Sequence, residues 1–77
     1  MSEFYRLIEQ QIPRLRRYAR ALTRNRERAD DLVQDTLSRA LVKEQFWQPG
    51  TNLGAWLFAI MLASRAALLH RSGEARS

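Results

Sequence analysis

The sequence predicts an all-α fold, a compact bundle of about three helices. Apolar residues make up 45% of the 77 residues, which is typical of a chain that folds around a core. Along three segments these residues recur at intervals of three and four, the spacing that places side chains on one face of an α-helix. A chain of this length is at most one domain. We expect that domain to span residues 1–70 and to be followed by a disordered tail over residues 71–77.

A first helix is expected from about Glu3 to Thr23, with Ser2 as its N-cap. Pro13 either kinks this helix or begins a new one, because proline lacks the backbone N–H that a helix interior uses. Helical spacing continues across the proline, so we favour a single kinked helix. The apolar residues that keep this spacing are Ile8, Ile12, Leu15, Ala19 and Leu22.

The second helix is predicted to begin after Asn25, a preferred N-cap residue, and to run to about Val42 or Lys43. One face has the spacing of a buried surface and consists of Ala29, Leu32, Val33, Thr36, Leu37, Ala40 and Leu41. Another face is a polar stripe, which we define as Asp31, Gln34, Asp35 and Ser38. Its side chains could accept hydrogen bonds from a basic partner. On the pattern alone, it could equally be the solvated side of an amphipathic helix.

The segment over residues 44–52 contains a Pro-Gly pair and is expected to be a loop. Thr51 or Asn52 can cap a third helix, predicted from Leu53 to about His70. The uninterrupted apolar run over residues 53–63 is too short to span a bilayer, so this helix should pack against the other two or keep one face for a partner. Core positions are the first expectation for its large side chains, Trp56, Phe58 and Met61.

Charge is distributed unevenly along the chain. The formal net charge is +5, and twelve of the thirteen basic residues are arginine. Arginine binds phosphates and carboxylates through two parallel hydrogen bonds, which favours nucleic acid or an acidic protein surface as partner, although a GC-rich genome would also give this composition. Seven arginines crowd into residues 14–28, and three aspartates follow within residues 30–35, which suggests two different partner surfaces.

The composition gives little support to enzyme or metal chemistry. Cysteine is absent, which excludes a disulfide framework and a thiolate metal cluster. His70 is the only histidine, and Asp31 with Asp35 lacks a third ligand for a divalent ion. We therefore expect a binding module with no catalytic residue, no metal and no cofactor. The N-terminus shows no secretory signal, so we expect a cytoplasmic protein that does not enter a membrane.

Three motifs, taken in order, carry a family resemblance. Residues 12–23 read IPRLRRYARALT, residues 29–36 read ADDLVQDT, and residues 50–61 read GTNLGAWLFAIM. In this order and with these gaps they resemble region 2 of bacterial RNA polymerase sigma factors, most of all the extracytoplasmic-function (ECF) group of the sigma-70 superfamily. The resemblance covers about residues 4–61, which is most of the chain.

The resemblance implies a role in transcription initiation. In this family the helix with the Asp-Leu-Val-Gln-Asp motif, residues 31–35 here, docks on the clamp helices of the β′ subunit of core RNA polymerase. The resemblance therefore implies that the polymerase-binding residues are Asp31, Gln34, Asp35 and Ser38. The loop before the third helix and the outer face of that helix capture the unpaired non-template strand of the minus-ten promoter element. The DNA-binding positions that this implies are Gly50, Thr51, Asn52 and Arg65, with Phe46 and Trp47 as candidates for base stacking.

The chain departs from the family pattern after Met61. Family members usually continue with an asparagine two residues on and then with an arginine-rich helix, whereas this chain has Ala63 and only Arg65, Arg71 and Arg76. A methyl group offers no hydrogen bond to a base. An alternative function is therefore a sigma-mimicking domain that binds polymerase or an anti-sigma protein without productive DNA recognition, and an arginine-rich nucleic-acid binder is a third. Without the family's helix-turn-helix domain, the sequence could be a fragment, a truncated sigma factor or a decoy.

Overall fold

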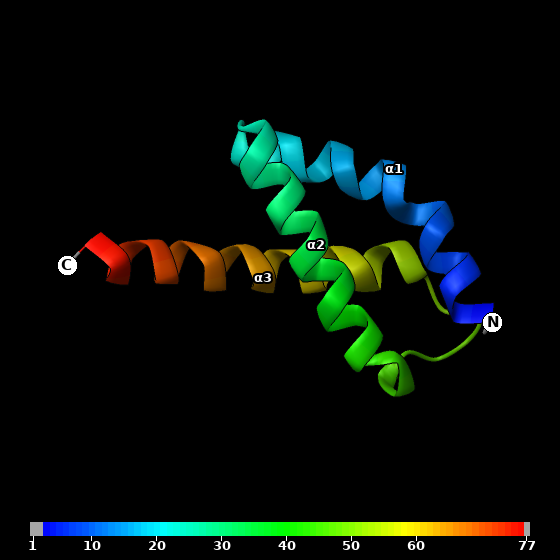
Figure 1. Ribbon diagram of the computed structural model, residues 1–77. Coiled ribbons are helices and arrows are strands. Elements are labelled where there is room, and N and C mark those ends of the chain that lie inside the picture. The colour runs from blue at the N-terminus through cyan, green and yellow to red at the C-terminus, as the bar shows by residue number, and fades with distance from the viewer. Residues whose placement is uncertain (1–2, 77) are drawn as a thin grey trace.

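The computed structural model describes the backbone of residues 3–76 and the side chains of residues 3–70. It contains three α-helices, α1 (Glu3–Thr23), α2 (Arg26–Val42) and α3 (Leu53–Arg76), and one turn of 3-10 helix, η1 (Glu44–Phe46). Figure 1 shows α1 and α2 joined by a tight turn, while α3 crosses α2 and extends beyond the other two helices. The prediction of an all-α fold with three helices is confirmed, and the described residues contain no β-strand.

The first helix has the bounds that the sequence predicts and runs without interruption across Pro13. Figure 1 shows that this helix bends along its length. One buried stripe continues on both sides of the proline and consists of Phe4, Ile8, Leu15 and Ala19. Packing of this stripe offsets the backbone hydrogen bond that proline removes, so a single helix forms instead of two.

The second helix begins at its predicted cap. Asn25 has an extended backbone (φ −147°, ψ 127°), and its side-chain oxygen accepts a hydrogen bond from the backbone N–H of Arg28 at 2.9 Å. Most of the predicted apolar face is buried, namely Ala29, Leu32, Val33, Thr36 and Ala40. Leu37 is partly buried. Leu41 is 37% exposed, so the prediction that Leu41 belongs to the buried face is wrong. Leu41 lies at the margin of the buried face, whereas Ala40 in the same helical turn is fully buried.

The segment between α2 and α3 contains one helical turn that the sequence did not predict. The backbone N–H groups of Phe46 and Trp47 donate to the carbonyl groups of Lys43 and Glu44, which forms η1. The loop prediction is therefore wrong for η1 and correct for the residues after it. A 3-10 turn needs only these local bonds, whereas Pro49 prevents a regular α-helix from continuing.

The third helix begins where predicted and ends later than predicted. The side-chain oxygen of Asn52 accepts a hydrogen bond from the backbone N–H of Ala55 at 3.0 Å, so Asn52 is the N-cap. The backbone stays helical to Arg76, whereas the sequence predicted a helix end near His70 and then a disordered tail. No proline follows His70, and one glycine costs a helix only about 1 kcal/mol, so no residue there stops the helix. The side chains of residues 71–77 lie outside the described residues.

One segment is long and apolar enough to cross a membrane. Leu53–His70 comprises 18 residues with a mean hydropathy of 1.5, so it is longer than the uninterrupted apolar run over residues 53–63. About a third of this segment (33%) is buried inside the domain. The core helix of a soluble protein has the same length and composition, so this property is weak evidence for a membrane span.

Side chains from all three helices form the core. Its largest fully buried apolar side chains are Leu15, Leu32, Leu57 and Met61, which confirms the core prediction for Met61. Trp56 and Phe58 are only partly buried. Their rings pack edge-on at the margin of the core, Trp56 against Phe4 (6.0 Å between ring centroids) and Phe58 against Tyr18 (5.1 Å).

Two buried hydroxyl groups differ in their hydrogen bonding. The Thr36 hydroxyl donates to the carbonyl oxygen of Leu32 at 2.7 Å. Ser64 is also fully buried, but its hydroxyl oxygen has no hydrogen-bond partner. A buried polar group without a partner costs about 1–3 kcal/mol of stability.

Leu57→Ala should lower the free energy of unfolding by about 2–5 kcal/mol, because it removes buried apolar surface and leaves a cavity. The matched control is Leu62→Ala on the same helix, where the side chain is 44% exposed. That variant should lose less than about 1 kcal/mol. Urea unfolding followed by circular dichroism measures both losses, and equal values would contradict the orientation of α3.

Ser64→Ala should raise the melting temperature, because it removes a buried hydroxyl that lacks a partner. Thr36→Ala is the matched control and should lower the melting temperature, because the Thr36 hydroxyl is hydrogen-bonded. Each 1 kcal/mol corresponds to roughly 4–8 °C in a domain of this size, so differential scanning calorimetry resolves both effects. A lower melting temperature for Ser64→Ala would mean that its hydroxyl stabilises the fold.

Candidate functional site

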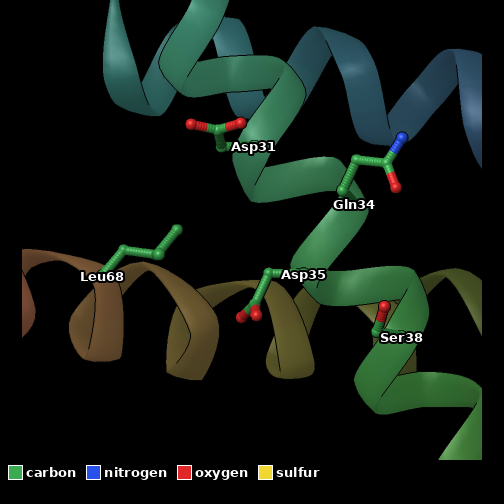
Figure 2. Close-up of a pocket in the computed structure, with 5 residues that line it drawn as sticks. All are labelled: Asp31, Gln34, Asp35, Ser38 and Leu68. Carbon is green, nitrogen blue, oxygen red and sulfur yellow. The ribbon is translucent and has the colours of Figure 1, made fainter.

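The polar stripe of α2 lines an open hollow in the protein surface. Its four residues and Leu68 of α3 surround a volume of about 300 Å³. Figure 2 shows Asp31 and Asp35 directed toward the side where Leu68 lies, whereas Gln34 is directed to the opposite side of α2. All four predicted residues of the stripe, Asp31, Gln34, Asp35 and Ser38, line the hollow, although the amide of Gln34 points away from Leu68.

The hollow exists because α2 and α3 cross instead of running side by side. Away from the crossing the two helices diverge, so α3 does not cover the stripe (Figure 1). Leu32 and Val33 are buried in the core, while their neighbours Asp31 and Gln34 are exposed. One helix therefore holds the core together with one face and presents polar groups on another.

One of the two carboxylates in the stripe is already paired. Asp35 Oδ2 accepts a hydrogen bond from Arg39 Nε at 2.8 Å, and the two side chains are 27% and 40% exposed. Asp31, Gln34 and Ser38 form no ion pair or side-chain hydrogen bond with another described residue. An ion pair four positions apart on a helix is worth only about 0.3–0.5 kcal/mol when it is open to solvent, and this pair is partly so, which lets a partner displace it at small cost.

Two residues of this site were not predicted from the sequence. Leu68 supplies the apolar side of the hollow, but it comes from another helix and no local pattern indicates its position. Arg39 could have been found, because its spacing of four residues from Asp35 is the spacing at which opposite charges pair on a helix.

The predicted DNA-binding loop is exposed at the N-terminus of α3. Gly50 has a φ of +93°, a conformation that glycine adopts without strain. The Thr51 hydroxyl donates to the carbonyl of Gln48 at 2.6 Å, and Asn52 uses its side-chain oxygen as the helix cap. Gly50, Thr51 and Asn52 are therefore held together, with two of their side chains engaged inside the loop.

Side chains of α1 reach this loop next to Gly54. A Cβ atom at Gly54 would lie 3.1 Å from Gln11 Oε1, 3.3 Å from Asn52 Oδ1 and 3.5 Å from Arg14 Nη1. The absence of a side chain at Gly54 therefore leaves room for these groups. The Arg14 guanidinium lies beside the predicted DNA-binding loop, which the sequence could not indicate because the contact joins α1 to α3.

Other predicted DNA contacts lie elsewhere. An α-helix rises about 1.5 Å per residue, so Arg65 lies roughly 18 Å beyond Leu53 along α3, and it is partly buried. Phe46 is 69% exposed. Trp47, the other candidate for base stacking, is partly buried and packs against the core, with its ring centroid 5.7 Å from that of Phe4.

The fold and these surfaces define an all-α domain of the sigma factor region 2 type. A solved structure described as the sigma factor RpoE in complex with the anti-sigma factor NepR from Bartonella quintana matches with a TM-score of 0.86 and 34% identity. Residues 8–62 match the family described as the sigma2 domain of PhyR, and the chain belongs to this family. All three sequence motifs lie inside the matched range.

A curated relative confirms the ECF group. The ECF RNA polymerase sigma factor EcfG of Rhodopseudomonas palustris (strain TIE-1) is 56% identical over 50 residues, which are 65% of this chain and 28% of that protein. The match to the solved sigma factor covers 96% of this chain and 46% of the other. The chain thus spans less than half the length of either relative. Sigma factors are transcription initiation factors without enzymatic activity, so the family confirms that the domain is not an enzyme.

Proposed function

We propose that this domain binds core RNA polymerase through the polar stripe of α2, on the clamp helices of the β′ subunit. The observation that carries the proposal is the hollow beside the stripe, where hydrogen-bond acceptors and an apolar side chain lie together. An arginine or lysine of the partner fits this site. Its cationic head can bind the unpaired carboxylate of Asp31 while its aliphatic stem lies against Leu68.

The remaining residues of the stripe add specificity to this proposed contact. Gln34 both donates and accepts hydrogen bonds, so it can pair with a backbone group or a side chain of the partner. Asp35 can exchange its bond to Arg39 for one to a partner cation, because partly exposed ion pairs within one helix contribute little to stability. Complementary charges of this kind also accelerate association and disfavour acidic partners.

We further propose that the loop before α3 contributes to recognition and melting of the minus-ten promoter element. Gly50, Thr51 and Asn52 are exposed beside a helix N-terminus, where backbone N–H groups and the Asn52 amide nitrogen can donate to a flipped base or a phosphate. Phe46, in the same segment between α2 and α3, offers an exposed ring on which a base can stack.

A second function is favoured by the composition of α3: a domain that binds polymerase or an anti-sigma protein without productive DNA recognition. Ala63 is exposed, at the position where members of the sigma factor family that this chain resembles usually have asparagine. Arg65 is the only arginine or lysine in residues 53–70. The solved relative is described as a complex with an anti-sigma factor, and an anti-sigma partner with basic residues could use the same stripe. Either function belongs in the cytoplasm, where bacterial transcription takes place.

Asp31→Arg should weaken binding to core RNA polymerase at least about tenfold, because it places a positive charge where the partner's cation is expected. Asp30→Arg is the matched control: it changes the charge equally at a neighbouring exposed residue outside the stripe. Biolayer interferometry with purified core polymerase measures both. Both variants should keep the stability of the unaltered domain within roughly 0.5 kcal/mol. Equal losses of binding would contradict the proposal.

Ala63→Asn should increase the preference for a minus-ten single strand over a scrambled one, because an amide can donate to and accept from a base edge. Ala63 is exposed, so the substitution should not disturb the fold. Ala66→Asn, also exposed on α3, is the control and should leave the preference unchanged. Fluorescence anisotropy at two salt concentrations should show an unchanged salt dependence, since a neutral amide neutralises no phosphate. If Ala63→Asn does not increase the preference for the minus-ten strand while polymerase binding is intact, the result supports a domain without productive DNA recognition.

A further inference from the structure

The segment over residues 14–28 carries more positive charge than the whole protein. It comprises the second half of α1, the turn and the start of α2 (Figure 1). Seven arginines and one glutamate give it a net charge of +6, whereas the whole chain carries +5, so the other residues sum to −1. All seven arginines are exposed, and they are Arg14, Arg16, Arg17, Arg20, Arg24, Arg26 and Arg28.

Among the residues whose side chains are described, none of these seven arginines forms an ion pair. The ion pairs among the described residues use Arg6 and Arg39, both outside the segment. Within α1, arginines lie three or four positions apart, as in Arg14 with Arg17 and Arg16 with Arg20. Like charges at these spacings repel one another, so the arrangement destabilises the free domain.

The turn between α1 and α2 contains further features that destabilise the free domain. Arg24 has a φ of +55°, in the left-handed region that favours glycine or asparagine. Arg26 and Arg28 lie in the first turn of α2, where the helix dipole favours acidic side chains instead of basic ones. The helix dipole favours Arg20 in the last turn of α1, but it disfavours Arg26 and Arg28, and a bound polyanion would neutralise the charges of all seven arginines.

We propose that residues 14–28 form a binding surface for the phosphate backbone of duplex DNA, without preference for base sequence. The planar guanidinium group of arginine pairs with phosphate oxygens through two hydrogen bonds. A protein partner fits this surface less well, because protein interfaces depend on aromatic or apolar anchors at their centre. Tyr18 is the exposed large apolar side chain of this segment, and its ring is already packed against Phe58.

Arg14 connects this surface to the loop before α3. Its Nη1 atom lies near Gly54 and close to Asn52, and Arg24 lies roughly 15 Å away at the far end of α1. A duplex bound along α1 would therefore continue from a single strand held by the loop, which places paired and melted DNA side by side. The continuation from duplex to single strand rests on the proposed promoter role of the loop. The proposal that residues 14–28 bind a duplex does not depend on that role.

The test compares two double variants that each remove two positive charges. Arg17→Gln with Arg20→Gln alters the centre of the proposed surface, and Arg6→Gln with Lys43→Gln is the matched control at exposed residues outside it. The probe is a fluorescent duplex of about 30 base pairs and arbitrary sequence, titrated at roughly 50–200 mM salt. Circular dichroism melting confirms that both variants are folded.

The Arg17→Gln, Arg20→Gln variant should lose roughly tenfold in affinity for the duplex at low salt. The plot of log K against log salt concentration has a negative slope, and this slope should become less steep by about 2. The control should keep both values close to those of the unaltered domain. Equal losses in the two variants, or no duplex binding by the unaltered domain, would overturn the proposal. So would displacement of the duplex by polyglutamate as effectively as by unlabelled DNA, since the surface would then fit an acidic protein.

Polymerase binding by the same proteins separates this proposal from the proposed function. The Arg17→Gln, Arg20→Gln variant should bind core polymerase as the unaltered domain does, because both residues lie outside the polar stripe. Asp31→Arg should bind the duplex at least as well as the unaltered domain, since it adds positive charge. Failure of the unaltered domain to bind polymerase would refute the proposed function and leave the duplex result unaffected.

Discussion

The structure depends on the packing of α2 against both other helices. α2 contacts α1 and α3 more extensively than these contact each other, so it is the central helix of the domain. Three alanines in the core, Ala19 of α1 and Ala29 and Ala40 of α2, are almost completely buried. Their short side chains allow neighbouring helices to approach closely, because the distance between packed helices is set by the side chains at the contact. The positions of the hollow, the loop and the basic segment all follow from this crossing arrangement.

Features that local interactions determine could be predicted from the sequence. The caps Asn25 and Asn52 bond to a backbone N–H three residues further on, so a short window contains both partners. The continuation of α1 across Pro13 followed from helical spacing of the apolar residues on both sides. The polar stripe could be found in the same way, since its members share one face of one helix.

Features that join distant segments could not be predicted in this way. Leu68 lines the hollow, and Arg14 lies beside Gly54, only because of the angles at which the helices cross. Leu41 fits the apolar spacing of α2 but lies at the margin of the core, because spacing alone does not reveal how wide a strip of a helix its neighbours cover. The continuation of α3 from His70 to Arg76 was not predicted for another reason: an absence of apolar residues does not stop a helix that lacks a proline.

The aromatic contacts of Phe4 constrain the loop before α3. The ring of Phe4 packs against Trp47 at one end of this loop and against Trp56 in the first turns of α3, with centroid distances of 5.7 and 6.0 Å. Both ends of the short intervening segment are therefore anchored to the same side chain of α1. A segment held in this way has lost much of its conformational entropy on folding, so little remains to be lost when it engages a ligand. The N-terminal turns of α1 thus preorganise a loop with which they share no backbone hydrogen bond.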